Sequence, residues 1–106
     1  MNKSDLKFIK SCMHQRKVFW TYHVNMRLKE RLLSREQIMN SVDSFEIIEG
    51  YPLDKYLPSC LIYAKCGNDV THIQIAIDRE NDNIRIITSY IPSRDKWEDD
   101  FKTRRP

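Results

Sequence analysis

The chain has 106 residues, the length of one ordinary domain, with a net charge of +3, 41% hydrophobic residues and 31% charged residues. This composition is typical of a soluble globular domain and allows one core without disulfides. Only two glycines occur, which excludes a glycine-rich phosphate-binding loop. No apolar run reaches the length of a membrane span and residues 1–10 lack a hydrophobic signal core, so we expect a cytoplasmic protein without a membrane partner.

The cysteines and histidines predict neither a disulfide framework nor a metal centre. Cys12, Cys60 and Cys66 are odd in number and contain no CxxC pair, so we expect buried thiols. The three histidines show no HExxH or HxH spacing. We therefore expect no metal and no cofactor.

The charges are distributed unevenly along the chain. Residues 1–35 hold nine Lys and Arg against two Asp and Glu, whereas residues 36–106 hold nine against thirteen. A basic half on a small domain is typical of a protein that binds a polyanion such as RNA. The alternative is a solvated basic helix face without a binding role.

Apolar spacing predicts helices in the first part of the chain. A first helix is expected over residues 4–15, with Ser4 as its candidate N-cap, and residues 16–20 then break the helical pattern. Thr21 can cap a second helix over residues 22–32.

The third helix is predicted by a capping box. Ser34 and Gln37 have the spacing that lets the Gln37 side chain reach the backbone N–H of Ser34. This helix is expected to extend to about residue 44 and to bury Ile38, Met39 and Val42.

The second half of the chain predicts four strands joined by short turns, over residues 45–51, 60–66, 70–78 and 84–90. Short connections favour an antiparallel meander, so we predict an α+β fold in which two or three N-terminal helices pack on a four-stranded antiparallel sheet. Alternation in the third strand places His72 and Gln74 on the face away from the helices, which is a candidate open face.

One column of side chains on the second helix is a candidate site. His23, Arg27 and Arg31 are spaced i, i+4 and i+8, so a helix presents them on one side. The helix N-terminus attracts phosphate and disfavours a charged imidazole, which makes His23 a candidate proton acceptor beside two phosphate-binding arginines. The alternative is that His23 packs locally and that the arginines pair with Glu30 or with the acidic tail.

Further candidates lie in the β half and in the tail. His72 is either a cross-strand partner or a catalytic group, and Tyr90, just before Pro92, is either a core-edge residue or a group that stacks a base or donates a proton. Trp97 and Phe101 are expected to pack the tail against the body. Candidate RNA-binding cations are Lys29, Lys65, Lys96, Arg104 and Arg105.

This inventory suits cleavage of RNA better than other reactions. The 2′-hydroxyl of RNA is an internal nucleophile, so the protein has to supply a base, an acid and cations around the phosphate. Histidine, tyrosine, lysine and arginine can do this without a metal. Paired carboxylates, a serine nucleophile elbow and a Cys–His pair at motif spacing do not occur.

Three stretches resemble a known family: TYHVNMRLKERLLSREQI from Thr21, HIQIAID from His72 and TSYIPSRDKWEDDF from Thr88. Together they resemble the small bacterial domain-of-unknown-function family numbered 4258, over about residues 18–105. The family pattern is a histidine opening a helix, later Arg and Glu-Arg, then Ser-Arg, with a Tyr-x-Pro, Trp and Asp-Phe ending. The chain departs from it at Leu32-Leu33, where many members have a glycine that ends the helix.

The resemblance implies a fold and a function. The family is similar to RelE-like toxins, which set helices on an antiparallel sheet and cleave mRNA without a metal, and its members are often encoded beside small zinc-finger antitoxins. It thus implies a toxin-like endoribonuclease, with RNA and a small antitoxin as partners. It assigns the site to His23, Arg27, Arg31, His72 and Tyr90, and it makes residues 1–17 a helical extension of a single domain over residues 18–106.

Two other functions stay open from the sequence. The same basic surface could serve a non-catalytic module that binds nucleic acid or a protein partner. A third reading is an antitoxin-like or structural protein whose tail, with Trp97 and Phe101, docks on another chain.

Overall fold

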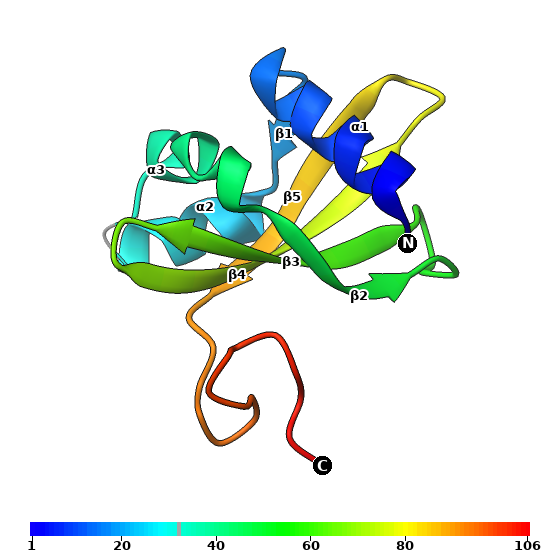
Figure 1. Ribbon diagram of the computed structural model, residues 1–106. Helices are drawn as coiled ribbons and strands as arrows, with labels where there is room; N and C mark the ends of the chain where they lie inside the picture. Colours follow the sequence, from blue (N-terminus) through cyan, green and yellow to red (C-terminus); the bar gives the residue numbers. More distant parts are fainter. Residues whose placement is uncertain (32) are drawn as a thin grey trace.

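The computed structural model describes residues 1–31 and 33–106 (Figure 1). Its helices are α1 (Lys3–His14), α2 (Tyr22–Glu30) and α3 (Arg35–Asn40), followed by a 3-10 turn, η1 (Val42–Ser44). Its strands are β1 (Val18–Trp20), β2 (Glu46–Tyr51), β3 (Ser59–Cys66), β4 (Asp69–Asp78) and β5 (Asn83–Tyr90). None of the helices described for residues 1–31 and 33–106 is long and apolar enough to cross a membrane.

The α+β class is confirmed, but the predicted four-stranded antiparallel sheet is wrong. The described strands form one mixed sheet in the order β1-β5-β4-β3-β2, in which β1 runs parallel to β5 and the other neighbours are antiparallel. The additional strand is the segment that breaks the helical pattern. With three residues it is too short to show alternation, and its pairing with β5 is not encoded in its own sequence.

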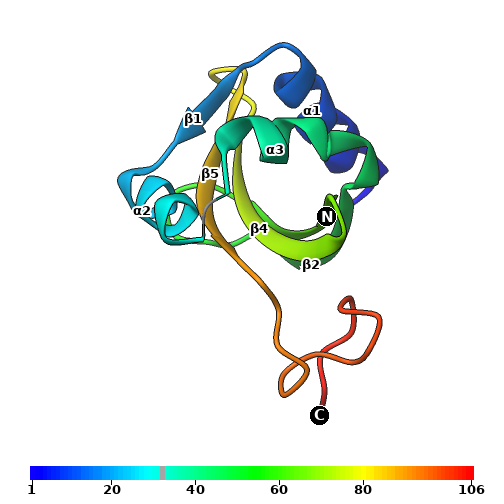
Figure 2. The same cartoon turned by 90° about the vertical axis from the view of Figure 1, so that its left-hand side faces the viewer.

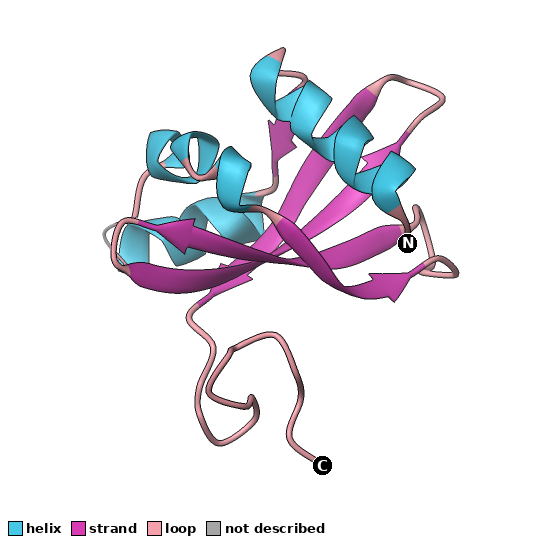
Figure 3. Ribbon diagram, viewed as in Figure 1, coloured by secondary structure: helices cyan, strands magenta, loops and turns pink. Residues whose placement is uncertain are grey.

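The helices and the end of the chain lie on opposite faces of the sheet. Figures 2 and 3 show α1 and α3 on one side of the curved sheet and the segment after β5 on the other. The core lies under the helices and includes Ile9 of α1, Val24 of α2, Ile38 of α3 and the inward residues of β3, β4 and β5. Because α1 contributes to this core, residues 1–17 pack as part of the same unit; their description as an extension of a shared domain stays a prediction.

The local helix signals explain where the helices begin. Thr21 caps α2, since its hydroxyl accepts the N–H of Val24, and Ser34 and Gln37 form the predicted capping box. The predicted cap Ser4 is wrong, because Asn2 begins α1 by a capping box with Asp5. The predicted end of the second helix at Leu32 lies outside the described residues.

A bulge in β5 decides where the side chain of Tyr90 points. Ile86 pairs with Ile75 and Thr88 pairs with Gln74, so Ile87 is an extra residue on β5. Paired residues share a face of the sheet, and beyond the bulge Tyr90 pairs with His72. Without the extra residue, Tyr90 would point into the core with Ile86.

A second bulge has the same effect on β2. Ile47 pairs with Ile62 and Glu49 pairs with Leu61, so Ile48 is the extra residue. As a result Glu49 and Tyr51 lie on the face that carries His72, away from the helices. The two bulges therefore bring polar side chains of β2, β4 and β5 onto one surface.

Candidate functional site

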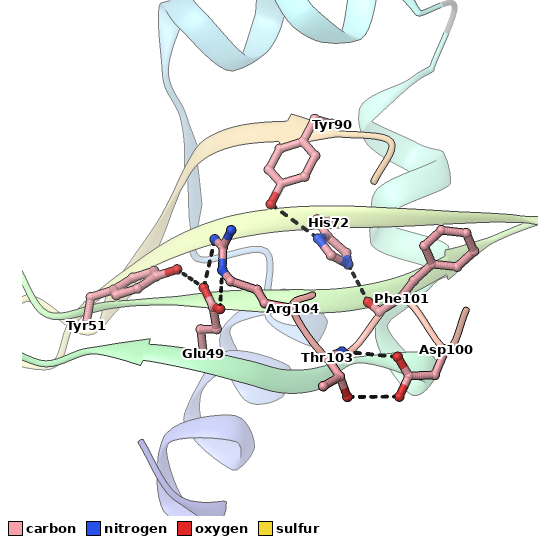
Figure 4. A network of polar contacts seen from close by, with 8 residues as sticks. All are labelled: Glu49, Tyr51, His72, Tyr90, Asp100, Phe101, Thr103 and Arg104. Carbon is pink, nitrogen blue, oxygen red and sulfur yellow. Dashed lines mark hydrogen bonds and ion pairs between the residues drawn. The ribbon is translucent and has the colours of Figure 1, made fainter. Parts of the chain in front are cut away.

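A group of polar side chains lies between the sheet and the C-terminal segment, defined here as residues 91–106. Figure 4 shows Glu49, Tyr51, His72 and Tyr90 on the sheet, with Phe101 and Arg104 of the C-terminal segment packed over them. All of these residues lie on the face opposite the helices. This cluster is the candidate functional site.

His72 is fully buried, so the expected open face is wrong at this position. The indole of Trp97 packs edge-on against the imidazole, with ring centroids 4.5 Å apart, and the Tyr90 ring lies 5.3 Å away. The strand pattern could not reveal this, because the cover comes from the C-terminal segment rather than from a neighbouring strand.

The hydrogen bonds of His72 fix its tautomer. Its Nε2 lies 2.7 Å from the carbonyl oxygen of Phe101, which can only accept, so Nε2 carries the proton and donates it. In the neutral ring Nδ1 is then an acceptor. The hydroxyl of Tyr90 lies 3.2 Å from Nδ1 and donates to it.

Local structure of the C-terminal segment sets the position of the Phe101 carbonyl. The Asp100 carboxylate accepts the backbone N–H of Lys102 and both the N–H and the hydroxyl of Thr103, which closes a tight turn. Phe101 adopts a left-handed backbone conformation with φ 56° in this turn. The turn therefore presents the Phe101 carbonyl to the imidazole.

Both members of the His72–Tyr90 pair are neutral at pH 7. Burial lowers the pKa of His72, against the opposing effects of the hydrogen bond to Phe101 and the charge of Glu49. Burial also raises the pKa of Tyr90 above 10.0. A phenol thus donates its hydrogen bond to a neutral imidazole.

The lowered pKa of His72 predicts a stability that falls at mildly acidic pH. The unfolded chain takes up a proton near the ordinary value of 6.5, whereas the folded protein does so at a lower pH, so the free energy of unfolding rises with pH in this window and levels off above it. Urea unfolding at pH 5 and pH 8 measures the difference. His72→Gln should remove it, whereas His14→Gln, at an exposed histidine, should preserve it; an unchanged dependence in His72→Gln would contradict the assignment.

Arg104 ties the C-terminal segment to β2. Its Nε and Nη2 donate to the two carboxylate oxygens of Glu49, at 2.6 and 3.1 Å, and the hydroxyl of Tyr51 donates to the same carboxylate. The bond to Arg104 lowers the pKa of Glu49, and burial, together with the bond to Glu49, raises the pKa of Tyr51 to about 12. The Arg104 guanidinium also stacks over the Trp97 ring at 4.6 Å.

A hollow of about 360 Å³ opens beside this cluster. Its lining consists of Tyr90, Ile91, Ser93, Lys96, Trp97 and Arg104. We call it the Tyr90 pocket. It places a phenol, an ammonium and a guanidinium around one space, so that a proton-bearing group and two cations lie together.

The predicted column of His23, Arg27 and Arg31 does not line the Tyr90 pocket. The His23 side chain is exposed and makes no hydrogen bond or ion pair within residues 1–31 and 33–106. Arg27 is exposed and lies 3.9 Å from Glu30, which matches the local pairing considered as the alternative. Arg31 is half-buried and lines a separate hollow that shares Ile91 with the Tyr90 pocket.

Some of the candidate RNA-binding cations line the Tyr90 pocket and others lie elsewhere. Lys96 and Arg104 line the Tyr90 pocket, whereas Arg105 pairs with Glu98 and Asp99 within the C-terminal segment. Lys29 on α2 and Lys65 on β3 are exposed and do not line this pocket. Their roles in RNA binding stay predictions.

Glu49, Tyr51 and Ser93 were not among the sequence candidates. The sequence places Glu49 beside two isoleucines in an apparently apolar strand, and the bulge that turns its side chain toward Arg104 has no signature in the sequence. The cysteines are free thiols, with Cys12 and Cys60 buried. In the described part of the chain, no group of three or more His, Cys, Asp or Glu side chains has a geometry that could hold a metal.

Comparison with known proteins gives one match. The family model described as Domain of unknown function (DUF4258) matches residues 20–91, which is more than half of the chain. The matched residues include His23, Arg27, Arg31, His72 and Tyr90, but not the part of the C-terminal segment that covers His72. No curated protein and no solved structure matches the chain.

Proposed function

This chain belongs to the DUF4258 family, and we propose that it is a toxin-like, metal-independent endoribonuclease that cleaves RNA in the Tyr90 pocket. The observation that carries the proposal is the hydrogen bond from Tyr90 to the neutral imidazole of His72 at the edge of a pocket that also holds Lys96 and Arg104. These groups match the requirements of transesterification at an RNA phosphate.

The proton path follows from the fixed tautomer. Tyr90 takes the proton of the RNA 2′-hydroxyl as its own proton passes to Nδ1 of His72, and the 2′-oxygen attacks the phosphorus. The bond from phosphorus to the 5′-oxygen breaks, and this oxygen, on the far side of the phosphorus, takes a proton from water while His72 releases its proton through Tyr90 to the resulting hydroxide. The products are a 2′,3′-cyclic phosphate and a 5′-hydroxyl, and both residues end as they began.

The surrounding charges act on the phosphate and on the imidazole of His72. Lys96 and the Nη1 group of Arg104 can contact the non-bridging oxygens of the phosphate, where negative charge develops. The carboxylate of Glu49 favours the transient positive charge on His72, since its charge acts to raise the pKa of this ring, whereas the charge of Arg104 acts to lower it. The Phe101 carbonyl keeps the imidazole oriented throughout.

End-group analysis of cleaved RNA tests the proposal. Purified protein is incubated with a mixed-sequence RNA in EDTA, and the products are examined for 2′,3′-cyclic phosphate and 5′-hydroxyl ends. We expect both ends to form. The proposed reaction needs no partner protein and no ribosome. Intact RNA at high protein concentration would therefore overturn the proposal.

One observation favours a second function, a non-catalytic module that binds RNA or a protein. The Arg104 guanidinium is paired with Glu49, and the Tyr90 hydroxyl is hydrogen-bonded to His72, so both groups have partners within the described residues. Salt-dependent RNA binding without turnover would indicate this function, because phosphate contacts release counterions whether or not a bond is cleaved.

The toxin assignment extends the proposal to a partner. The similarity of the family to RelE-like toxins supports a cognate antitoxin, a small protein of the zinc-finger type, that blocks the endoribonuclease in the cell. Co-expression with the protein encoded beside this chain tests this part, since an antitoxin restores growth and co-purifies. A neighbour that does neither would remove the antitoxin assignment.

A further inference from the structure

A second hollow lies next to the Tyr90 pocket and contains a half-buried arginine. The hollow measures about 150 Å³ and is lined by Arg31, Leu33, Gln37, Asp69 and Ile91, among others. Ile91 also lines the Tyr90 pocket, so the two spaces are adjacent. We call this space the Arg31 hollow.

The Arg31 side chain has no partner in the part of the chain that the structure describes: it makes no hydrogen bond, ion pair or cation–π contact there. Burial and the charge of Arg27 both lower its pKa, and Glu30 only partly offsets them. Charged groups withdrawn from water are normally paired in folded proteins. An anion from outside the chain would supply the missing partner.

The neighbouring groups suit an anion as well. The side-chain oxygen of Gln37 accepts the backbone N–H of Ser34 at 2.7 Å, so its amide nitrogen is left to donate. Leu33 and Ile91 provide an apolar wall that strengthens a charge-assisted bond. Asp69 is the opposing group: its residue also lines the hollow and is exposed, and its carboxylate repels an anion.

We propose that the Arg31 hollow binds the phosphate next to the cleaved one, so that the substrate is an oligoribonucleotide with at least two consecutive phosphates. This rests on the proposed function, since it takes the cleaved linkage to be in the Tyr90 pocket. The guanidinium can hold the flanking phosphate through two N–H donors and so align the strand across Ile91.

Substrates that differ by one phosphate test this subsite. Three substrates are compared. The first is a dinucleoside monophosphate, the second is the same compound with a further phosphate at its 5′ end, and the third is the same compound with a further phosphate at its 3′ end. The protein should cleave one of the two longer compounds about tenfold better by kcat/KM. Arg31→Gln should abolish this preference, and Asp69→Asn should increase it; Lys7→Gln, an exposed substitution of equal charge on α1, should leave it unchanged.

The outcomes separate the subsite from the proposed function. Cleavage without a preference for the added phosphate, or a loss in Lys7→Gln equal to that in Arg31→Gln, would overturn the subsite and leave the function intact. If no substrate is cleaved, the function fails, and binding of an uncleavable 2′-deoxy oligonucleotide becomes the readout. A salt dependence that falls by about 0.7 in slope in Arg31→Gln would then support the subsite, and an unchanged slope would overturn it.

Discussion

Replacement of Tyr90 by phenylalanine is expected to reduce RNA cleavage about 100- to 1,000-fold and to leave RNA binding nearly unchanged. The substitution removes one oxygen, which lies 3.2 Å from Nδ1 of His72. The ring still packs against the imidazole. Single-turnover rates with a defined RNA, together with binding of its 2′-deoxy analogue, separate the two effects.

His23→Ala is the informative comparison for this experiment. His23 is exposed on α2 and has no contact with the His72–Tyr90 pair within the described residues, so the variant should keep most of the activity. If His23 is instead the general base, as its place at the helix start suggests, the large loss will occur in His23→Ala. Full activity in Tyr90→Phe would contradict the proton path proposed for the Tyr90 pocket.

Replacement of Trp97 by alanine is expected to lower the free energy of unfolding by about 3–5 kcal/mol. Trp97 is 2% exposed and lies between the buried imidazole of His72 and the guanidinium of Arg104. Its removal leaves a cavity over His72 and loosens the C-terminal segment, which Lys102 and Arg104 otherwise tie to β2 through Glu46 and Glu49. Cleavage should fall with stability, because Phe101 no longer orients the imidazole.

Denaturant unfolding monitored by circular dichroism measures this loss. Leu53→Ala is the matched control, since this apolar side chain is 95% exposed and its truncation should change stability by less than about 0.5 kcal/mol. A loss below about 1 kcal/mol in Trp97→Ala would mean that the C-terminal segment does not form part of the folded unit. The candidate site would then lack its cover.

Strong local signals made much of the fold predictable. The capping residues Thr21 and Ser34 mark helix starts at the positions found in the structure, and alternation in β4 assigns its residues to the correct faces. The long-range pairing of β1 with β5 was not predictable, because three residues carry no periodic pattern. The helix start at Asn2 was missed although a capping box with Asp5 is present in the sequence.

The sequence identified side chains of the site but not their arrangement. His72 and Tyr90 stand out by residue type, yet their contact depends on the bulge at Ile87, which changes the side of the sheet on which Tyr90 lies. The role of Glu49 depends likewise on the bulge at Ile48. Such bulges arise from tertiary packing, and a pattern with period two continues through them without a visible break.

The C-terminal segment is the other part that sequence patterns could not place. Trp97 and Phe101 predicted packing against the body, and Trp97 does pack there. A turn closed by Asp100 presents the Phe101 carbonyl instead of a side chain. Residue type cannot reveal a contact that is made by a backbone carbonyl.

The tautomer of His72 tests the account most directly, and nitrogen NMR of the imidazole measures it. Above pH 6.5 we predict a protonated, pyrrole-type Nε2 and an unprotonated, pyridine-type Nδ1, whose resonance shifts in Tyr90→Phe because that nitrogen loses its donor. The reverse tautomer, or a doubly protonated ring at pH 7, would contradict the account, since Nδ1 could not then accept the proton of Tyr90.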